Sequence, residues 1–366
     1  MNRDTAIAWV LSLCAAYLRL SQAKTLSELV AATLGAARIS LSEIGRRLVD
    51  PVAAKHRIKR TWRFVANDRV EVSDAMRGVV AKVLRRRKKP LLVAFDGTDI
   101  RGFCTLMASI PFKGRCVPLV WATYEKWELS KSQNNLEEGL LRVLRSMIPA
   151  GLRVILLADR GFGRTELRRL CQELGFHYII RISPDVYVRG EDWTGLLSDL
   201  PVHKGLCRLL RNVEYRQQDP VRQHGVVRWK PGLPKNRDEP WFLMTDLDGD
   251  PLALSELYGR RMTVEELFRD DKNKRNGWAL RDTQITRADR IDRLLLILAL
   301  AYLLLVGIGL VARRRFRPGA WCSSNNPRQC SVFTIGRILV ERLQVSPASA
   351  FSAVLAATAA VVPNWG

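Results

Sequence analysis

The segment Tyr258-Gly-Arg-Arg-Met-Thr-Val-Glu-Glu-Leu-Phe-Arg-Asp-Asp-Lys272 is the most informative part of this sequence. Arg261, Glu265 and Lys272 follow Tyr258 after three, seven and fourteen residues. On an α-helix these four side chains fall within roughly 60° of one another. A stripe with a hydroxyl, a guanidinium, a carboxylate and an ammonium group needs a polar partner, such as a phosphate chain or a metal. A solvated helix face is the alternative, which this segment taken alone favours.

The composition indicates a folded protein with a polyanionic partner. The chain has 366 residues, 47% of them hydrophobic, and its 59 Lys+Arg outnumber its 36 Asp+Glu, for a formal net charge of +23. Such an excess indicates nucleic acid more often than an anionic membrane surface. About half of the net charge lies in residues 1–90, where cations could meet phosphates.

Cysteine and histidine usage argues against a zinc site and a disulfide framework. The seven cysteines form no Cys-x-x-Cys pair, and there are only four histidines. A reducing cytosol is therefore the expected compartment. The N-terminal segment has no small-residue cleavage site, so we expect no signal peptide.

The segment from Leu294 to Ala312 contains no charged residue and has arginines on both sides. Its length makes it a transmembrane candidate. A helix buried on all sides within a large protein has the same composition. Both interpretations stay open for this segment taken by itself.

Residues 1–90 have the pattern of a helical, basic domain. Thr25-Leu-Ser-Glu28 and Ser40-Leu-Ser-Glu43 both fit the capping-box spacing at a helix start. Between them and a helix expected from Ser73 to about Leu84 lies the basic stretch 55–63. Short helices interleaved with Lys, Arg and Trp suit DNA binding. A simple helical cap is the alternative.

From residue 91 the pattern changes to an α/β arrangement. Leu91–Phe95 and Arg153–Ala158 are apolar runs of strand length that end at Asp96 and Asp159. Further strands are expected at 103–110, 116–124 and 177–182, with helices at 134–147 and 164–174. This order predicts a mixed sheet with helices on its faces.

The remaining segments complete the expected organisation. Residues 183–240 alternate strand-like pieces with turns, which predicts a β-rich insertion. A short strand at 241–245 follows, and Asp250-Pro251 predicts the start of the helix that carries Tyr258. Residues 316–366 are expected to be a loop and two helices, at 332–343 and 348–361.

Asp96, Asp159 and Glu265 are the candidate metal ligands. Two of them end strands of one sheet, where open α/β sheets present functional groups, and the third lies on a helix that can pack across it. Three converging carboxylates repel one another unless cations neutralise them, and hard oxygen ligands favour Mg²⁺ or Mn²⁺. For each aspartate singly, an ordinary turn position is the better interpretation. The combination favours the metal site.

The chain resembles the DDE transposases of bacterial insertion sequences, specifically the IS-four-like family. That family carries a Y-x₂-R-x₃-E-x₆-K signature, and Tyr258, Arg261, Glu265 and Lys272 match all four positions. Its aspartate contexts are matched by Phe95-Asp96-Gly-Thr and by Asp159-Arg-Gly-Phe162. The resemblance spans roughly residues 55–311. It implies an RNase H-like catalytic core over 91–315, with the insertion 183–240 inside it, between a helical DNA-binding domain and a helical C-terminal region.

The resemblance also implies roles for individual residues. Asp96, Asp159 and Glu265 would be catalytic and hold two Mg²⁺ or Mn²⁺ ions for in-line phosphoryl transfer. Tyr258, Arg261 and Lys272 would hold phosphates of the transposon end. Trp241 resembles a tryptophan that stacks on a flipped base, although a core position is also reasonable. Asp99 and Glu266 rank second as carboxylates, Glu266 because it lies about 100° around the helix from Glu265.

These observations predict a cut-and-paste transposase that binds terminal inverted repeats and target DNA. The resemblance implies a homodimer in the synaptic complex, cytoplasmic and nucleoid-associated, with no membrane partner. One alternative is a catalytically inactive or domesticated DNA-binding protein derived from a transposase. Another is a membrane protein anchored by residues 294–312.

Overall fold

The N-terminal part of the chain is helical in the computed structural model, which describes residues 1–360 except 86, 113, 216–220, 233–237, 324–325 and 327–328. Its five helices are α1 (Arg3–Cys14), α2 (Leu20–Leu34), α3 (Leu41–Arg47), α4 (Ala54–Val65) and α5 (Val72–Leu84). The predicted helix start at Ser40 is confirmed, since the Ser40 side chain accepts a hydrogen bond from the Glu43 amide. The start at Thr25 is wrong. Thr25 lies inside α2, and its hydroxyl donates to the Ser21 carbonyl one turn earlier.

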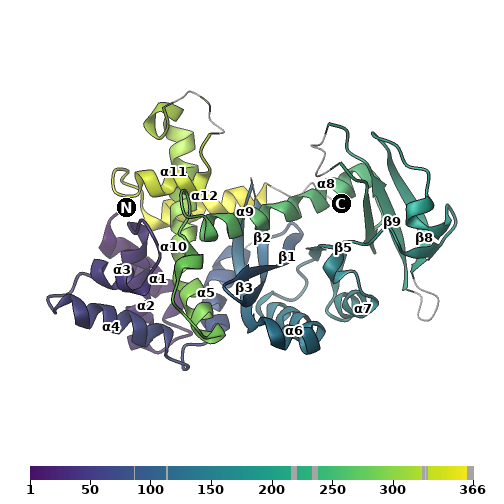
Figure 1. Ribbon diagram of the computed structural model, residues 1–366. Coiled ribbons are helices and arrows are strands. Elements are labelled where there is room, and N and C mark those ends of the chain that lie inside the picture. Colours follow the sequence, from purple (N-terminus) through teal and green to yellow (C-terminus); the bar gives the residue numbers. More distant parts are fainter. Residues whose placement is uncertain are drawn as a thin grey trace.

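Within the described residues, a mixed sheet of ten strands forms the centre of the molecule, in the order β3-β2-β1-β4-β5-β10-β9-β8-β6-β7 (Figure 1). The core strands are β1 (Leu91–Ile100), β2 (Phe103–Phe112), β3 (Arg115–Glu125), β4 (Val154–Ala158), β5 (Phe176–Arg181) and β10 (Trp241–Thr245). β1, β4 and β5 are parallel, whereas β2, β3 and β10 run antiparallel to their neighbours. Helices α6 (Lys126–Met147) and α7 (Thr165–Glu173) complete this α/β unit, as the strand order predicted.

The first core strand is longer than its apolar run. β1 does not end at Asp96 but continues to Ile100, because residues 94–100 pair with β2. Its parallel pairing with β4 does stop there, at Phe95 opposite Ala158. Asp96 is therefore the first residue of β1 after its pairing with β4 stops. For the Asp96 side chain, this position is equivalent to the end of a strand.

The expected insertion is β-rich where the structure describes it. Its strands are β6 (Tyr187–Arg189), β7 (Thr194–Leu196), β8 (Cys207–Tyr215) and β9 (Val221–Arg228). They continue the central sheet through the antiparallel pair of β9 and β10, and they form the right-hand end of the molecule in Figure 1. A separate small hydrophobic cluster, which includes Val188, Leu210 and Phe242, stabilises this end.

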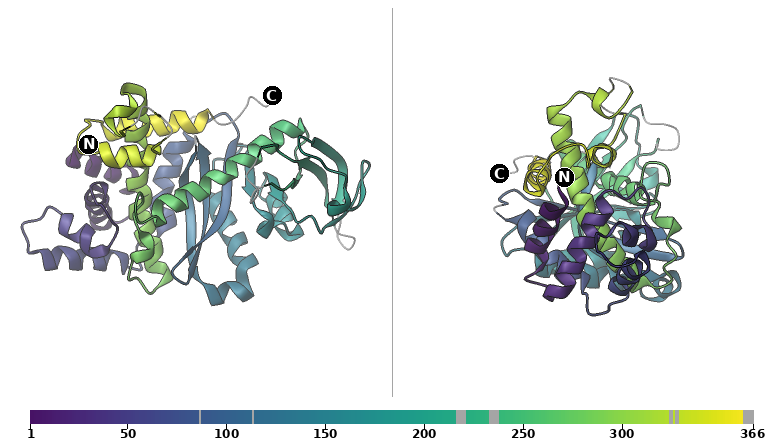
Figure 2. Two further views of the ribbon diagram at one scale, coloured as in Figure 1. Left: turned by 45° about the horizontal axis from the view of Figure 1, so that its top comes forward. Right: turned by 90° about the vertical axis from the view of Figure 1, so that its left-hand side faces the viewer.

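The charge-free segment 294–312 lies in α10 (Ala288–Arg315), a helix long and apolar enough to cross a membrane. All of its most apolar window is buried, and α10 lies between the N-terminal helices and the sheet (Figures 1 and 2). Two glycines allow close helix contact, since a Cβ on Gly309 would lie 1.8 Å from the Val332 carbonyl oxygen. Gly336 meets the Leu305 carbonyl oxygen in the same way. Burial of this kind is that of a core helix.

Two helices follow α10 near the C-terminus, α11 (Val332–Leu339) and α12 (Pro347–Ala359). Ser331 and Ser346 cap them, each accepting a hydrogen bond from the amide three residues later. Both helices were expected, α11 four residues longer than observed. The predicted end of the last one, at residue 361, lies outside the described residues.

The segment that carries the four-residue signature is not one continuous α-helix. α8 (Pro251–Gly259) starts as predicted, with the Asp250 side chain accepting from the Ala253 amide. A 3₁₀ turn, η4 (Arg260–Met262), then leads into α9 (Thr263–Lys272). The 3₁₀ turn shifts the side chains from the angular positions of a uniform α-helix. The side chains of the stripe from Tyr258 to Lys272 therefore differ in how much of each is exposed.

Candidate active site

Two aspartates lie next to each other because two strands are parallel and in register. Phe95 of β1 pairs with Ala158 of β4, so Asp96 and Asp159 are the next residues on adjacent strands. Asp159 starts a 3₁₀ turn, where its carboxylate accepts a hydrogen bond from the Arg160 amide at 2.7 Å. Asp96 likewise accepts from the Gly97 amide at 2.8 Å. Both side chains are thus fixed by their own backbone.

The third carboxylate comes from the helix that crosses the sheet. α9 packs against β1, β2 and β3, and its apolar side, which includes Val264, Leu267 and Phe268, is buried. Glu265 lies beside this buried side, and the preceding turn η4 packs against β1. α9 therefore brings Glu265 towards the two aspartates.

Arg261 lies among all three carboxylates. Its guanidinium contacts Asp96 at 2.7 Å, Glu265 at 3.1 Å and Asp159 at 3.7 Å. Only 5% of its side chain is exposed. The resemblance implied that Arg261 holds DNA phosphates. In the structure its ion-pair partners are the three carboxylates.

Among the described residues, Arg261 is the cation that lies within ion-pair distance of all three acids. Burial raises the pKa of Asp96 to about 6, and the carboxylates of Asp159 and Glu265 add to this rise. The Arg261 guanidinium and the Gly97 amide oppose it. Burial lowers the pKa of Arg261, but its anionic surroundings outweigh burial and the net shift is upward. Arg261 therefore stays charged, and the cluster attracts further cations.

The three acids open into a pocket of about 530 Å³. Arg269, Lys272, Asn273 and Arg281 also line it. In the part of the chain that the structure describes, no three His, Cys, Asp or Glu side chains stand in an arrangement that could hold a metal ion. The donor set is nevertheless that of a hard cation, since every candidate ligand is a carboxylate. The Arg261 guanidinium lies between these carboxylates.

The other signature residues lie around this pocket at different depths. Lys272 donates a hydrogen bond from Nζ to the Thr98 hydroxyl at 2.6 Å, and it lines the pocket. Tyr258 is 1% exposed, and burial raises the pKa of its hydroxyl. Trp241 packs edge-on against Tyr258 with ring centroids 5.2 Å apart. Trp241 is half-buried, so it combines a packing role with partial access to the surface.

The two rival carboxylates have other partners. Asp99 pairs with Lys126 at 2.8 Å, and its side chain is 61% exposed. Glu266 pairs with Arg269 at 2.7 Å and with Arg115 at 3.5 Å. Neither lines the pocket of Asp96 and Glu265. The structure thus separates Glu265 from Glu266 as the helical phase predicted.

Sequence reasoning missed other polar residues of the pocket, among them Thr98, Arg269 and Arg281. Thr98 lies in the part of β1 beyond the apolar run, and Arg269 has the spacing of an ordinary ion pair with Glu266. Arg281 lies in a 3₁₀ turn (Leu280–Asp282) that follows Ala279, a residue with a φ of 55°. No periodic pattern marks such a turn, and Gly97 and Asp99, which are residue types uncommon in strands, obscure the continuation of β1.

Residues 127–304 match the family model described as the transposase DDE domain. This range contains Asp159 and Glu265 and the full Tyr258-to-Lys272 segment, while Asp96 precedes it. The match supports a DDE transposase, and with it transposase activity in general and DNA as the substrate. The large mixed sheet is consistent with an RNase H-like domain of this kind. No curated protein matches the chain.

Proposed function

We propose that this chain is an insertion-sequence transposase of the IS-four-like type, which cuts DNA at terminal inverted repeats and joins the ends to target DNA. The observation that carries the proposal is the convergence of three carboxylates, from β1, the turn after β4 and α9, on one pocket. These residues come from distant parts of the chain and meet around one cation. The family match over residues 127–304 supports the same reaction class.

Asp96, Asp159 and Glu265 are the residues that would hold divalent cations, Mg²⁺ or Mn²⁺. Such ions, when bound, activate an attacking water or 3′-hydroxyl and stabilise the leaving oxygen of the phosphodiester. The chain itself supplies the orientation. Backbone amides hold both aspartates, and the packing of α9 on the sheet fixes the helix that carries Glu265.

Arg261 is the resident counter-cation of the site in the absence of DNA. It reduces the repulsion among the three acids, since every one lies within ion-pair distance of its guanidinium. Binding of divalent cations to these carboxylates requires Arg261 to leave them. A DNA phosphate at the pocket gives its guanidinium a new partner, which reconciles the observed ion pairs with a phosphate-binding role.

The other predicted functional residues take part around this centre. Lys272 lies at the pocket with a charge that suits a DNA phosphate, and Tyr258 with Trp241 forms an aromatic pair beside Arg261. Residues 1–90 and the β-rich insertion would bind the inverted repeats. The protein would act as a homodimer in the synaptic complex, in the cytoplasm at the nucleoid.

Cleavage of DNA tests the proposal directly. The purified protein is incubated with Mg²⁺ or Mn²⁺ and a labelled duplex from the DNA that flanks its gene. We expect strand cleavage that disappears in Asp96→Ala, Asp159→Ala and Glu265→Ala and persists in the control Asp99→Ala, whose carboxylate faces Lys126. Activity that survives in the three variants would contradict the site. Normal binding without cleavage under either metal would favour a catalytically inactive DNA-binding protein.

A further inference from the structure

Three pockets adjoin one another and lead away from the candidate active site. The second pocket, of about 530 Å³, shares Arg269 and Asn273 with the pocket of the three carboxylates. The third, of about 520 Å³, shares Asn276 and Thr334 with the second. The third pocket ends at residues 34–37 and Arg47 of the N-terminal helices. We call the second and third pockets, together with the Arg281 side of the carboxylate pocket, the basic groove.

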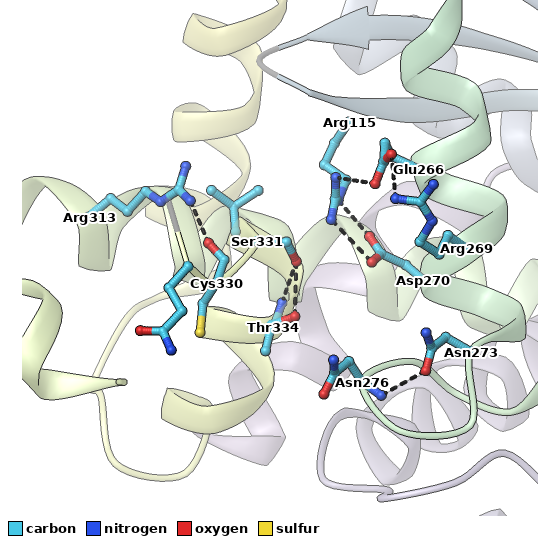
Figure 3. A pocket seen from close by; sticks show the side chains of 12 residues that line it. Arg115, Glu266, Arg269, Asp270, Asn273, Asn276, Arg313, Cys330, Ser331 and Thr334 are labelled. Atoms are coloured by element: carbon cyan, nitrogen blue, oxygen red, sulfur yellow. Dashed lines mark hydrogen bonds and ion pairs between the residues drawn. The ribbon is translucent and has the colours of Figure 1, made fainter. Parts of the chain in front are cut away.

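The walls of the second pocket are held by their own ion pairs and hydrogen bonds (Figure 3). On one wall Arg115 pairs with Asp270 at 2.6 Å, and Arg269 pairs with Glu266 at 2.7 Å. On the other wall Arg313 donates to the Cys330 carbonyl oxygen at 2.6 Å. The shape of this pocket is therefore set before any ligand binds.

One arginine of the third pocket links three parts of the chain by hydrogen bonds. Arg337 of α11 donates to the carbonyl oxygens of Asn276 and Gly277, in the loop after α9, at 3.0 and 2.7 Å. It also donates to the Ala37 carbonyl oxygen at 2.7 Å. Arg337 thus joins the C-terminal helices, the loop after α9 and the N-terminal helices. The groove is a preformed feature of the fold.

Three cations on the groove have no such structural role. Arg281 lines the pocket of the three carboxylates, and Arg275 and Arg342 line the third pocket. All three are exposed, and none has a side-chain hydrogen bond or an ion pair to any residue that the structure describes. Cations also outnumber acids over the second and third pockets, where the acids are Glu266, Asp270 and Glu341. An extended anion is the ligand that this arrangement favours.

We propose that the basic groove binds the phosphate backbone of the DNA duplex that carries the cleaved phosphate, on the stretch between the active site and the N-terminal helices. One end of the groove opens into the carboxylate pocket and the other reaches the helices expected to bind the inverted repeats. The cut DNA has to contact both regions, whereas target DNA has to contact only the active site. This inference rests on the proposed function.

A charge-matched pair of variants tests the groove. The groove variant carries Arg275→Gln, Arg281→Gln and Arg342→Gln. The control carries Arg142→Gln and Arg145→Gln on α6, which lies far from α11 in Figure 1, and Arg153→Gln just before β4. Both lose the same charge, so any difference between them reports position rather than net charge. Thermal unfolding of each variant shows whether the fold is retained.

Binding is measured in EDTA, so that no cleavage occurs, over a range of salt concentrations. The probes are a labelled duplex from the DNA flanking the gene and a mixed-sequence duplex of equal length. Each phosphate contact contributes about 0.9 to the slope of log affinity against log salt, so three contacts predict a slope smaller by about 2 to 3. For the flanking duplex, we expect this loss and at least a tenfold weaker affinity in the groove variant, with a much smaller change in the control.

The native Cys330 gives a second readout, because it lies in the wall of the second pocket and is half-buried. We expect the flanking duplex to slow its modification by N-ethylmaleimide, measured by mass spectrometry against the rate without DNA. Cys330 modified at an unchanged rate under saturating duplex would contradict the proposal. So would equal binding of the flanking duplex by the groove variant and the control, or a loss seen with the mixed-sequence duplex alone.

The outcomes also separate this inference from the proposed function and from another partner. Cleavage by the wild type, with a groove variant that binds like the control, overturns the groove alone. Groove-dependent binding without cleavage under any metal overturns the enzyme alone. A groove variant that keeps the flanking duplex but loses polyglutamate would overturn the DNA assignment in favour of an acidic protein segment.

Discussion

Two arginine-centred clusters lie on neighbouring faces of α9, and they differ in their balance of charge. In the Arg261 cluster one guanidinium faces three carboxylates, Asp96, Asp159 and Glu265. In the Arg115 cluster two arginines, Arg115 and Arg269, face Glu266 and Asp270. In the first, three acids share one guanidinium, although Arg269, Lys272 and Arg281 also line their pocket. The second is neutral.

The two clusters also differ in their hydrogen bonds. In the Arg115 cluster, Asp270 also accepts a hydrogen bond from the Tyr302 hydroxyl at 3.1 Å, so the buried acid is well satisfied. In the Arg261 cluster, the buried Tyr258 hydroxyl makes no hydrogen bond to an acid in the described structure. A neutral cluster stabilises a fold, whereas three acids around one guanidinium are arranged for a cationic ligand.

The largest expected effect distinguishes the adjacent glutamates of the two clusters. Glu265→Gln removes a candidate metal ligand, which is worth several kcal/mol of transition-state stabilisation, or at least about a thousandfold in cleavage rate. Glu266→Gln changes only the Arg115 cluster and should reduce the rate less than about tenfold. Single-turnover cleavage of the flanking duplex measures both. Comparable losses in the two variants would remove the functional distinction between the clusters.

Arg115→Gln should be the most destabilising change in the neutral cluster. The Arg115 and Asp270 side chains are largely buried, and breaking a buried pair leaves one charge unpaired at a cost of about 3 kcal/mol. Arg269→Gln is the control, since the Arg269 side chain is 56% exposed and exposed pairs contribute about 1 kcal/mol or less. Urea unfolding measures both. Equal stabilities would show that the Arg115 cluster does not support the fold.

Arg261→Gln should strengthen metal binding by the DNA-free protein. Without the guanidinium the three carboxylates lose their resident cation, so a divalent ion no longer competes with it. We expect Mn²⁺ to bind about ten to a hundred times more tightly, equivalent to about 1.4 to 2.8 kcal/mol. Calorimetric titration measures this, with Arg115→Gln as the control. Weaker Mn²⁺ binding in folded Arg261→Gln would show that Arg261 supports the site rather than competing at it.

The smallest effect concerns Asp271, a carboxylate of α9 that belongs to neither cluster. Asp271 is 6% exposed and has no ion pair or hydrogen bond from its side chain within the described residues. Burial raises its pKa well above the usual value, Asp270 raises it further, and Lys272 opposes the rise. The folded state therefore keeps a proton that the unfolded chain releases above about pH 4.

It follows that the free energy of unfolding should fall as pH rises from about 4 towards the folded-state pKa of Asp271. Asp271→Asn removes this dependence. We expect the variant to exceed the wild type by about 1 to 2 kcal/mol at pH 8 and to gain nothing at pH 4. Urea unfolding at several pH values measures the difference, with the exposed Asp99→Asn as the control. Parallel pH profiles for Asp271→Asn and the wild type would contradict the argument.

Much of the fold was predictable because local patterns specify it. The apolar runs before Asp96 and Asp159 predicted two strands, and the structure places them side by side. Ser40 and Asp250 predicted helix starts where they occur. Thr25 failed, since its spacing also fits the interior of a helix, where its hydroxyl donates to a carbonyl one turn back.

The candidate site was predictable in its residues but not in its contacts. The helical phase separated Glu265 from Glu266, and their different partners in the structure agree with that separation. The position of Arg261 among three carboxylates was not predictable, because two of its partners are distant in the sequence. The 3₁₀ turn at 260–262 was also missed, since no residue type in it marks the change of helix geometry.

The sequence by itself determined which side chains are available and where the regular elements carry them. Strand and helix periodicity depends on local sterics and on the alternation of apolar and polar residues, and both can be read from the sequence. Only the tertiary structure decided that Asp96 and Asp159 share a register, that Arg261 lies between them and Glu265, and that α10 is enclosed. Such pairings depend on which distant segments pack together, and burial then sets the charge balance of the site.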